Sequence, residues 1–166
     1  MNYHIEAMNA AHWPQVRAVY LEGIATGQAT FETDAPSSWE EWEASHLTHS
    51  RLVAVSGEAV AGWAALSSVS KRRVYRGVAE VSVYVGRGRR GEGIGRALLE
   101  ALVLSSERNG IWTLQAGVFP ENAASIAVHR ACGFREVGRR ERIGEMRGVW
   151  RDTLLLERRS EIVGAD

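Results

Sequence analysis

The feature that most constrains the fold is a segment rich in glycine and arginine, residues 86–95, which reads Gly-Arg-Gly-Arg-Arg-Gly-Glu-Gly-Ile-Gly. It follows alternating β-branched residues at 78–85 and precedes an apolar stripe with helical spacing at 93–108. A strand therefore enters a helix through a loop with few side chains. Such a junction presents free backbone N–H groups and the positive end of the helix dipole, which favour phosphate. Glycines permit close backbone approach, and arginines add charged donors.

Other interpretations of this segment fit less well. Gly86, Gly88 and Gly91 satisfy the dinucleotide spacing G-x-G-x-x-G, but the next expected strand, 112–118, carries no acidic residue for a ribose. A P-loop requires lysine and then serine or threonine directly after its last glycine, whereas Glu92 and Gly93 follow Gly91 here. A glycine-rich turn with solvated arginines remains as the plain alternative.

Strand and helix patterns alternate along the whole chain, which predicts a mixed α/β layer fold. The lack of repeats and linkers predicts a single domain, 1–158, with a short C-terminal tail, 159–166. Segment 26–34 is expected to be a loop. The expected strands are 3–8, 52–55, 60–66, 78–85, 112–118, 134–138 and 149–157, and the expected helices are 11–23, 37–49, 93–108 and 122–132.

The composition limits the partners of the chain. Its 166 residues include 20 Lys plus Arg and 20 Asp plus Glu, so the formal net charge is zero, unlike a typical nucleic-acid-binding domain. Cys132 is the single cysteine and implies no internal disulfide. No signal-peptide pattern opens the sequence, and no run of about 18 apolar residues occurs. We expect a cytoplasmic protein with no nucleic-acid or membrane partner, and the scattered histidines predict no metal site.

A second motif covers residues 122–134, Asn-Ala-Ala-Ser-Ile-Ala-Val-His-Arg-Ala-Cys-Gly-Phe. Together with Arg-Gly-Glu-Gly-Ile-Gly at 90–95, it resembles the GNAT acetyltransferase superfamily, whose acyl-CoA loop has the pattern Arg/Gln-x-x-Gly-x-Gly/Ala. The resemblance extends over about 3–158 and implies the GNAT fold. That fold has a central, twisted, mixed and mostly antiparallel sheet of about seven strands, flanked by about four helices. The resemblance also implies acetyl-CoA as cofactor.

In this family, backbone amides of the loop hold the pyrophosphate of coenzyme A, and an asparagine contacts its pantetheine arm. Backbone N–H groups of Val83 or Val85 would bind the thioester oxygen. The Tyr84 side chain is expected to point to the opposite face from those two residues. The implied cofactor-binding residues are Val83, Tyr84, Val85, Arg90, Gly91, Glu92, Gly93, Ile94, Gly95, Arg96, Asn122 and Ser125.

Four stretches narrow the resemblance to the phosphinothricin and methionine sulfoximine/sulfone N-acetyltransferases. They are 30–33, 75–85, 118–122 together with His129, and 148–152. This branch implies a homodimer and a role in antibiotic or herbicide resistance. It often carries aromatic-Arg-x-Arg-Pro-Ala-Tyr-Arg before the central strand, where this chain has Ser-Lys-Arg-Arg-Val-Tyr-Arg at 70–76. The residues that line the substrate pocket are therefore expected to differ.

Glu80 is the predicted catalytic base. A carboxylate in the middle of an apolar strand is costly unless it is paired or faces a wet cleft, and the branch has its general base at this position. An alkyl ammonium must lose a proton before it attacks a thioester. A solvent-facing strand residue is the alternative. His129 stands where many family members have a tyrosine that protonates the leaving thiolate, so it is either this catalytic acid or a packed histidine.

The predicted substrate-binding residues are Phe31, Glu32, Arg73, Tyr75 and Arg76. One of the arginines would bind the carboxylate, phosphinate or sulfone oxygens of the substrate. The resemblance implies an acetyl-CoA-dependent N-acetyltransferase whose small amino-acid-like substrate attacks the thioester directly. Cys132 follows a helix C-terminus, which disfavours a thiolate nucleophile. The alternatives are another acceptor, such as a polyamine, an aminoglycoside or a protein N-terminus, or a non-catalytic acyl-CoA-binding regulatory domain.

Overall fold

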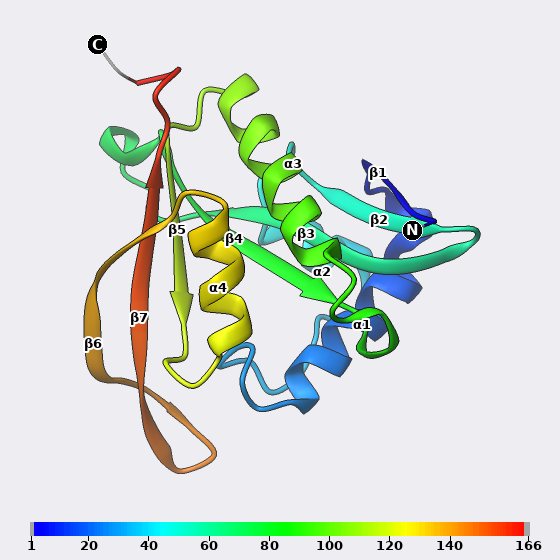
Figure 1. Cartoon of the computed structure of the whole chain (residues 1–166), viewed down its shortest axis with the longest axis horizontal. Coiled ribbons are helices and arrows are strands. Elements are labelled where there is room, and N and C mark those ends of the chain that lie inside the picture. The colour runs from blue at the N-terminus through cyan, green and yellow to red at the C-terminus, as the bar shows by residue number, and fades with distance from the viewer. Residues whose placement is uncertain (1, 165–166) are drawn as a thin grey trace.

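The computed structural model describes residues 2–164 and contains one seven-stranded sheet with helices on both faces (Figure 1). The strands are β1 (His4–Ala7), β2 (Leu52–Ser56), β3 (Ala59–Ser68), β4 (Val78–Val85), β5 (Thr113–Val118), β6 (Arg135–Met146) and β7 (Val149–Arg159). Their order across the sheet is β1-β2-β3-β4-β5-β7-β6. Only the β4–β5 pair is parallel among the paired strands of the described chain. The predicted mixed, mostly antiparallel sheet is confirmed.

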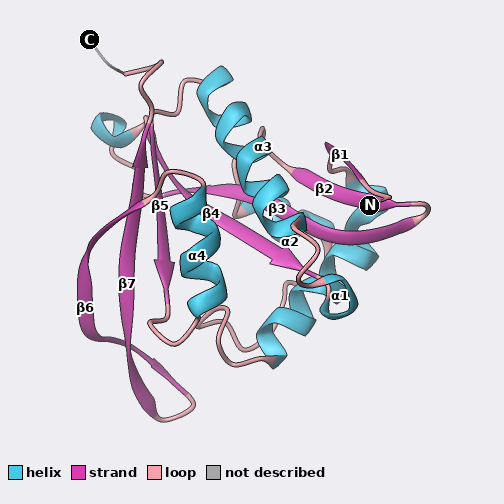
Figure 2. Ribbon diagram, viewed as in Figure 1, coloured by secondary structure: helices cyan, strands magenta, loops and turns pink. Residues whose placement is uncertain are grey.

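The helices form a layer on each side of the sheet. They are α1 (Trp13–Ala25), α2 (Trp39–Ala44), α3 (Ile94–Arg108) and α4 (Ala123–Ala131), with short 3₁₀ turns η1 (Ala10–His12), η2 (Arg73–Tyr75) and η3 (Arg87–Arg89). α3 and α4 pack on one face, and α1 and α2 pack on the other (Figure 2). Among residues 2–164, no helix combines the length and apolar character needed to cross a membrane.

Alternating strand residues divide between two cores, as the pleat of a strand requires. On β3, Ala64 and Leu66 pack beneath α3, while Trp63 and Ala65 pack against α1 and α2. The apolar stripe predicted for α3 is Ile94, Ala97, Leu98, Ala101 and Leu102. Ile94, Leu98 and Leu102 of this stripe are buried, together with Leu99 and Val103, whereas Ala97 and Ala101 are only partly buried. The same alternation on β4 sends Val81 toward α3 and leaves Glu80 on the opposite face.

The second helix is shorter than predicted. Ser38 caps it as expected by accepting the N–H of Glu41. The helix ends at Ala44, because the Ser45 hydroxyl and the His46 ring both donate to the carbonyl of Trp42. The expectation of a helix to residue 49 is therefore wrong beyond Ala44, since these polar side chains compete for the helical carbonyls.

The last two strands form a hairpin that is longer than predicted. β6 continues to Met146, whereas the sequence indicated only 134–138, and the chain turns at Arg147 and Gly148, whose φ angles are 52° and 81°. Most side chains of β6 are exposed on both faces, so the strand lacks an apolar alternation. β6 is held in the sheet by its hydrogen-bonded pairing with β7, which an apolar pattern does not reveal.

The first residue of the predicted C-terminal tail, 159–166, belongs to the sheet. Arg159 still belongs to β7, and the backbone N–H of Ser160 donates to the carbonyl of Trp112. The Ser160 hydroxyl donates to Glu107 on α3, so this residue attaches the chain end to that helix. Residues 165–166 of the predicted tail lie outside the described part of the chain.

The sheet opens between β4 and β5. These strands pair only from Val78 to Glu80, opposite 113–115. Beyond this point β4 stays paired with β3, and β5 stays paired with β7 (Figure 1). The C-terminal halves of β4 and β5 therefore separate, and the N-terminal ends of α3 and α4 follow at this edge.

Candidate active site

A groove of about 510 Å³ begins at the glycine-rich loop and reaches the opening between β4 and β5. We call it the loop groove. Its lining includes Gly23, Thr26, Gln28, Ala29, Val83, Tyr84, Val85, Arg89, Arg90, Gly91, Gly93, Ile94, Gly95, Arg96, Asn122, Ala124, Ser125, Val128 and His129. The groove thus combines backbone from β4 with the first turns of α3 and α4.

The loop groove has the chemistry of a pyrophosphate site. Gly91 and Gly93 have φ angles of 82° and 80°, a region that favours glycine. Gly93 is the N-cap of α3 and has no side chain to occupy the first N–H groups of the helix. Those groups remain available to an anion, and Arg89, Arg90 and Arg96 add positive charge along the same wall.

All but one of the predicted cofactor-binding residues line the loop groove. The exception is Glu92, whose carboxylate accepts a 2.7 Å hydrogen bond from the Nε of Arg89. Glu92 thus orients an arginine of the groove and does not border the groove itself.

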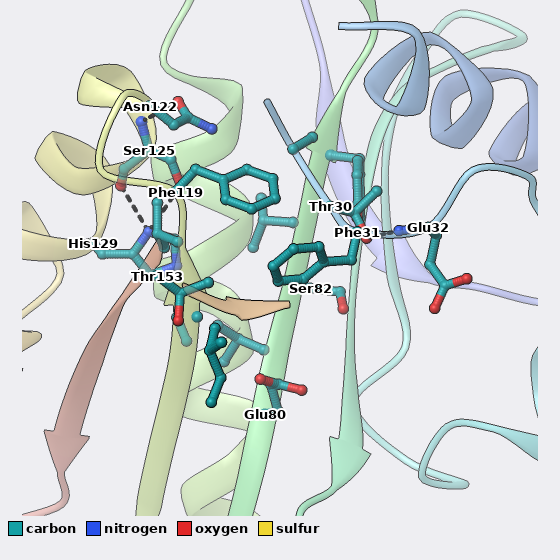
Figure 3. A pocket seen from close by; sticks show the side chains of 18 of the residues that line it. Thr30, Phe31, Glu32, Glu80, Ser82, Phe119, Asn122, Ser125, His129 and Thr153 are labelled. Carbon is teal, nitrogen blue, oxygen red and sulfur yellow. Dashed lines mark hydrogen bonds between the residues drawn. The ribbon is translucent and has the colours of Figure 1, made fainter. Parts of the chain in front are cut away.

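A second cavity, of about 370 Å³, lies on the face of the sheet that carries α1 and α2 (Figure 3). We call it the carboxylate cavity, after Glu80. Its lining includes Ala29, Thr30, Phe31, Glu32, Glu80, Val81, Ser82, Val83, Tyr84, Ala116, Gly117, Val118, Phe119, Asn122, Ser125, His129, Arg140, Ile143 and Thr153. Glu80, Phe31 and Glu32 are therefore brought together in one cavity, as predicted.

Glu80 is half-buried, and its carboxylate reaches across the strand opening toward β5. One carboxylate oxygen lies 3.9 Å from the place where a Cβ on Gly117 would stand. Burial raises the pKa of Glu80, and the positive charge of Arg140 partly opposes that rise. The carboxyl is therefore a stronger proton acceptor, once ionised, than an ordinary surface glutamate.

The two cavities meet where β4 and β5 separate. Both are lined by Ala29, Val83, Tyr84, Asn122, Ser125 and His129. A ligand in the loop groove and a second ligand beside Glu80 would thus touch at this junction.

His129 stands at the junction on α4 and is buried. Its Nδ1 lies 2.7 Å from the carbonyl oxygen of Ser125, one helical turn earlier (Figure 3). A carbonyl only accepts, so Nδ1 donates, and the neutral ring keeps Nε2 as an acceptor. Burial lowers the pKa of His129, which favours this neutral form, although the Ser125 carbonyl opposes the shift.

Tyr84 packs as predicted on the face opposite Val83 and Val85. Its ring stacks on Trp63 with centroids 4.8 Å apart, while the two valines face the core beneath α3. Burial raises the pKa of Tyr84 far above the ordinary value, so its hydroxyl stays neutral. A Cβ on Gly23 would come within 2.7 Å of this ring, which explains a glycine in α1 at that position.

The loop at 26–32 forms the roof over the junction. Arg151 of β7 fastens it, because its guanidinium donates to the Gly27 carbonyl and to the Gln28 side chain. The same guanidinium lies 3.6 Å from the ring centroid of Phe119. On the next turn of the loop, Phe31 packs edge-on against Phe119, with centroids 4.9 Å apart.

The remaining predicted substrate residues, Arg73, Tyr75 and Arg76, border neither cavity. They lie in and after the exposed turn η2, where the guanidinium of Arg72 covers the ring of Tyr75 and Arg76 donates to the carbonyl of Arg73. Within this chain the expected arginine clamp is therefore not formed, because the local contacts of a 3₁₀ turn hold these side chains outside.

The residues of the carboxylate cavity that were not predicted include Arg140 and Ile143 of β6 and Thr153 of β7. Their strands are paired in register, with Arg140 opposite Thr153, so both side chains stand on the same face. The sequence offered one hint, the 148–152 stretch, which lies directly before Thr153.

Cys132 lies outside both cavities, at the C-cap of α4. Burial raises the pKa of its thiol, so the thiolate is scarce. Within residues 2–164, no three side chains of His, Cys, Asp or Glu gather as a metal-binding group.

A groove with the chemistry of a pyrophosphate site that joins a cavity containing a half-buried carboxyl suits a transferase with two substrates. Comparison with known proteins agrees with this class. A sequence profile described as the Acetyltransferase (GNAT) family matches residues 10–134. A phosphinothricin N-acetyltransferase from Alcaligenes faecalis is 34% identical over 151 residues, which cover 87% of this chain and 76% of that protein.

Further relatives extend the match. An L-methionine sulfoximine/L-methionine sulfone acetyltransferase from Pseudomonas paraeruginosa is 28% identical over 162 residues, 95% of this chain and 94% of that protein. A GNAT superfamily phosphinothricin acetyltransferase from Sinorhizobium meliloti, solved with acetyl-CoA, superposes with a TM-score of 0.90 at 31% identity and covers all of this chain and 92% of that one.

The chain belongs to the GNAT acetyltransferase family and has its fold. It is an N-acetyltransferase, and acetyl-CoA is its acetyl donor.

Proposed function

We propose that this enzyme acetylates the primary amine of a small amino-acid-like substrate, of the phosphinothricin or methionine sulfoximine/sulfone type, by direct attack of the amine on the thioester. The observation that carries the proposal is the junction, where six residues line both cavities. An amine beside Glu80 and an acetyl group at the end of the loop groove would be in contact there. The substrates of the Alcaligenes and Pseudomonas relatives, after which those enzymes are named, support this substrate type.

Acetyl-CoA supplies an acetyl group activated as a thioester. Glu80 accepts a proton from the substrate ammonium, directly or through a water, so that the nitrogen lone pair is free. The amine nitrogen forms a bond to the acetyl carbon, the carbon–sulfur bond breaks, and its electron pair leaves on the sulfur. The nitrogen gives up its second proton to the departing thiolate, directly or through water, so that the products are the amide and coenzyme A. Backbone N–H groups of Val83 or Val85 are the donors proposed for the carbonyl oxygen.

In this proposal, the proton for the thiolate does not come from His129. Proton donation from Nε2 would require the imidazolium, and burial disfavours that form. We assign His129 a positioning role, with Nδ1 fixed on Ser125 and its ring edge-on to Phe134 at 5.1 Å.

We also propose that the enzyme is a cytoplasmic homodimer that can confer resistance, as the resemblance implies. The last two strands carry exposed apolar side chains that a dimer contact could cover; they include Val137, Val149 and Trp150. Sedimentation of the purified protein tests the oligomeric state, and growth on a phosphinothricin medium tests the resistance role.

Initial-velocity kinetics test direct attack. The rate of thiol release is measured while acetyl-CoA and methionine sulfone are varied together. Direct attack predicts double-reciprocal lines that intersect and an enzyme that carries no acetyl group after incubation with acetyl-CoA alone. Parallel lines together with an acetylated protein would show a two-step transfer through a protein nucleophile instead.

A further inference from the structure

Arg140 points into the carboxylate cavity from a strand that no helix covers on this face. Its register partner Thr153 is only 9% exposed and lines the same cavity, whereas Leu154 and Leu156 of β7 face the core beneath α4. Since α1 contacts β3 and β4, it leaves this face of β5, β7 and β6 open. Arg140 therefore borders the cavity at its solvent side, opposite Glu80.

The guanidinium of Arg139, the preceding residue of β6, is engaged by a carboxylate, and that of Arg140 is not. Asp152 binds the Arg139 side chain through one oxygen at 2.7 Å and the Arg142 backbone N–H through the other, also at 2.7 Å. In the part of the chain that the structure describes, no carboxylate lies within 4.0 Å of the Arg140 guanidinium. Its donors are available to a ligand.

Local structure fixes where Arg140 stands. The ladder with β7 shifts register between Glu136 and Gly138, pairs regularly from Gly138 to Arg140, and then bulges between Arg140 and Gly144. Asp152 holds Arg142 in this bulge at a φ of 48°. Gly144 lies so close to Phe31 that a Cβ would meet the ring at 2.6 Å, so the far end of the bulge rests on the roof loop.

Apolar side chains also line the cavity that Arg140 borders. Ile143, Phe31 and Phe119 line it together with Arg140. The cavity thus offers a base at Glu80, one uncommitted guanidinium at Arg140 and an apolar wall. The arginines before β4 do not reach it, which leaves Arg140 as the arginine among its lining residues.

We propose that Arg140 is the specificity-determining residue that binds the acidic group of the acceptor. The acceptor is then a zwitterion, with its amine at Glu80, its carboxylate or similar anionic oxygens at Arg140, and an uncharged side chain against Ile143 and Phe119. Guanidinium binds such oxygens through paired donors, which a lysine or an uncharged residue does not reproduce. This inference rests on the function proposed above.

Matched substrates test the inference. Steady-state rates are measured for L-methionine sulfone and its α-amide with the wild type, with Arg140→Met and with the control Arg135→Met. Arg135 lies on the same strand but borders neither cavity, and 67% of its side chain is exposed. The expected result for Arg140→Met is a loss of about 10- to 100-fold in kcat/KM for the acid, mainly through KM, with a much smaller change for the amide.

Arg140→Lys should restore part of the activity toward the acid, and Arg135→Met should behave like the wild type. A wild type that acetylates acid and amide equally well, or an Arg140→Met variant that keeps its preference for the acid, would overturn the role of Arg140 while leaving the acetyltransferase proposal intact. If the wild type acetylates neither compound nor any other amino acid, the proposed function itself fails. Thermal unfolding of each variant shows whether it is folded.

Discussion

At the scale of single residues, the site depends on β4, which turns an apolar face toward α3 and a second face, with Glu80, toward the carboxylate cavity. Val81, Val83 and Val85 of β4 pack toward α3, so Glu80 must stand on the other side. That side is half-buried by the roof loop and by the bulge of β6, which raises the pKa of the carboxyl. These surroundings suit Glu80 to the role of base that we propose for it.

The pH dependence of turnover follows from this shift. Glu80 accepts a proton only when ionised, so kcat/KM should fall as the pH is lowered through its pKa. Because burial raises that pKa, the acidic limb should have its midpoint above the ordinary value of 4.5. Glu80→Gln should lose about 100-fold or more in kcat/KM and lose this limb, while the limb that belongs to the substrate amine remains.

The control for this prediction is binding. Calorimetry should give the same affinity for acetyl-CoA in Glu80→Gln as in the wild type, because Glu80 does not border the loop groove. A Glu80→Gln variant with an unchanged pH profile would remove Glu80 from the mechanism.

The sequence located Glu80, Phe31 and Asn122 at the cavities because each is tied to a regular pattern: a strand alternation, a motif or a helix cap. It misplaced Arg73 and Arg76, because the direction of a side chain in a short turn depends on contacts that no periodicity encodes. Arg140 was not predicted as a site residue for a related reason. β6 is exposed on both faces, so nothing in its composition distinguishes the cavity side.

At the scale of elements, the entry into α3 depends on glycines. Gly93 caps the helix at a φ of 80°, where a side chain costs about 1–2 kcal/mol. Gly93→Ala should therefore lower the free energy of unfolding by about this amount and weaken acetyl-CoA binding, measured by denaturant unfolding and calorimetry. Gly88→Ala is the matched control, because Gly88 has no positive φ and no atom within 4 Å of an added Cβ. Equal effects of the two substitutions would contradict the argument.

The roof loop at 26–32 is held by Arg151 of a distant strand and by the Asn122 side chain, which donates to the Gln28 carbonyl. Only 13% of the Arg151 side chain is exposed, and it also pairs with Glu121 at 3.4 Å. Arg151→Met should cost about 2 kcal/mol, the scale for hydrogen bonds of a charged donor, and should speed proteolysis within the loop. KM should rise for both substrates, because the loop borders both cavities.

Arg130→Met serves as the comparison for that change. Its side chain is 58% exposed and pairs only with Glu136 at 3.3 Å, so its loss should change stability by less than about 1 kcal/mol. If Arg151→Met behaves like this exposed substitution, the loop is held by other contacts.

Most elements were predicted from sequence within a few residues, since their apolar periodicity matches their burial. The exceptions share a cause. α2 ended early because Ser45 and His46 bind a helical carbonyl, and β6 was underestimated because pairing with β7, and not an apolar face, holds it in the sheet. Both depend on contacts between segments or side chains that a periodicity analysis does not include.

At the scale of the whole molecule, the function depends on how the layers are arranged. α1 and α2 cover only part of one sheet face, and the sheet opens between β4 and β5. The uncovered part becomes the carboxylate cavity, and the opening connects it to the groove at the N-terminus of α3 (Figure 1). The family motifs predicted the groove, but the junction became visible only in three dimensions.

The most direct test of the proposed function is product analysis by mass spectrometry. The purified enzyme is incubated with acetyl-CoA and each member of a panel: phosphinothricin, methionine sulfoximine, methionine sulfone, common amino acids, a polyamine and an aminoglycoside. We expect one acetyl group on the amine of an amino-acid-like member of the panel, with one equivalent of coenzyme A released. Acetylation of the polyamine or the aminoglycoside alone, with every amino-acid-like compound untouched, would contradict it.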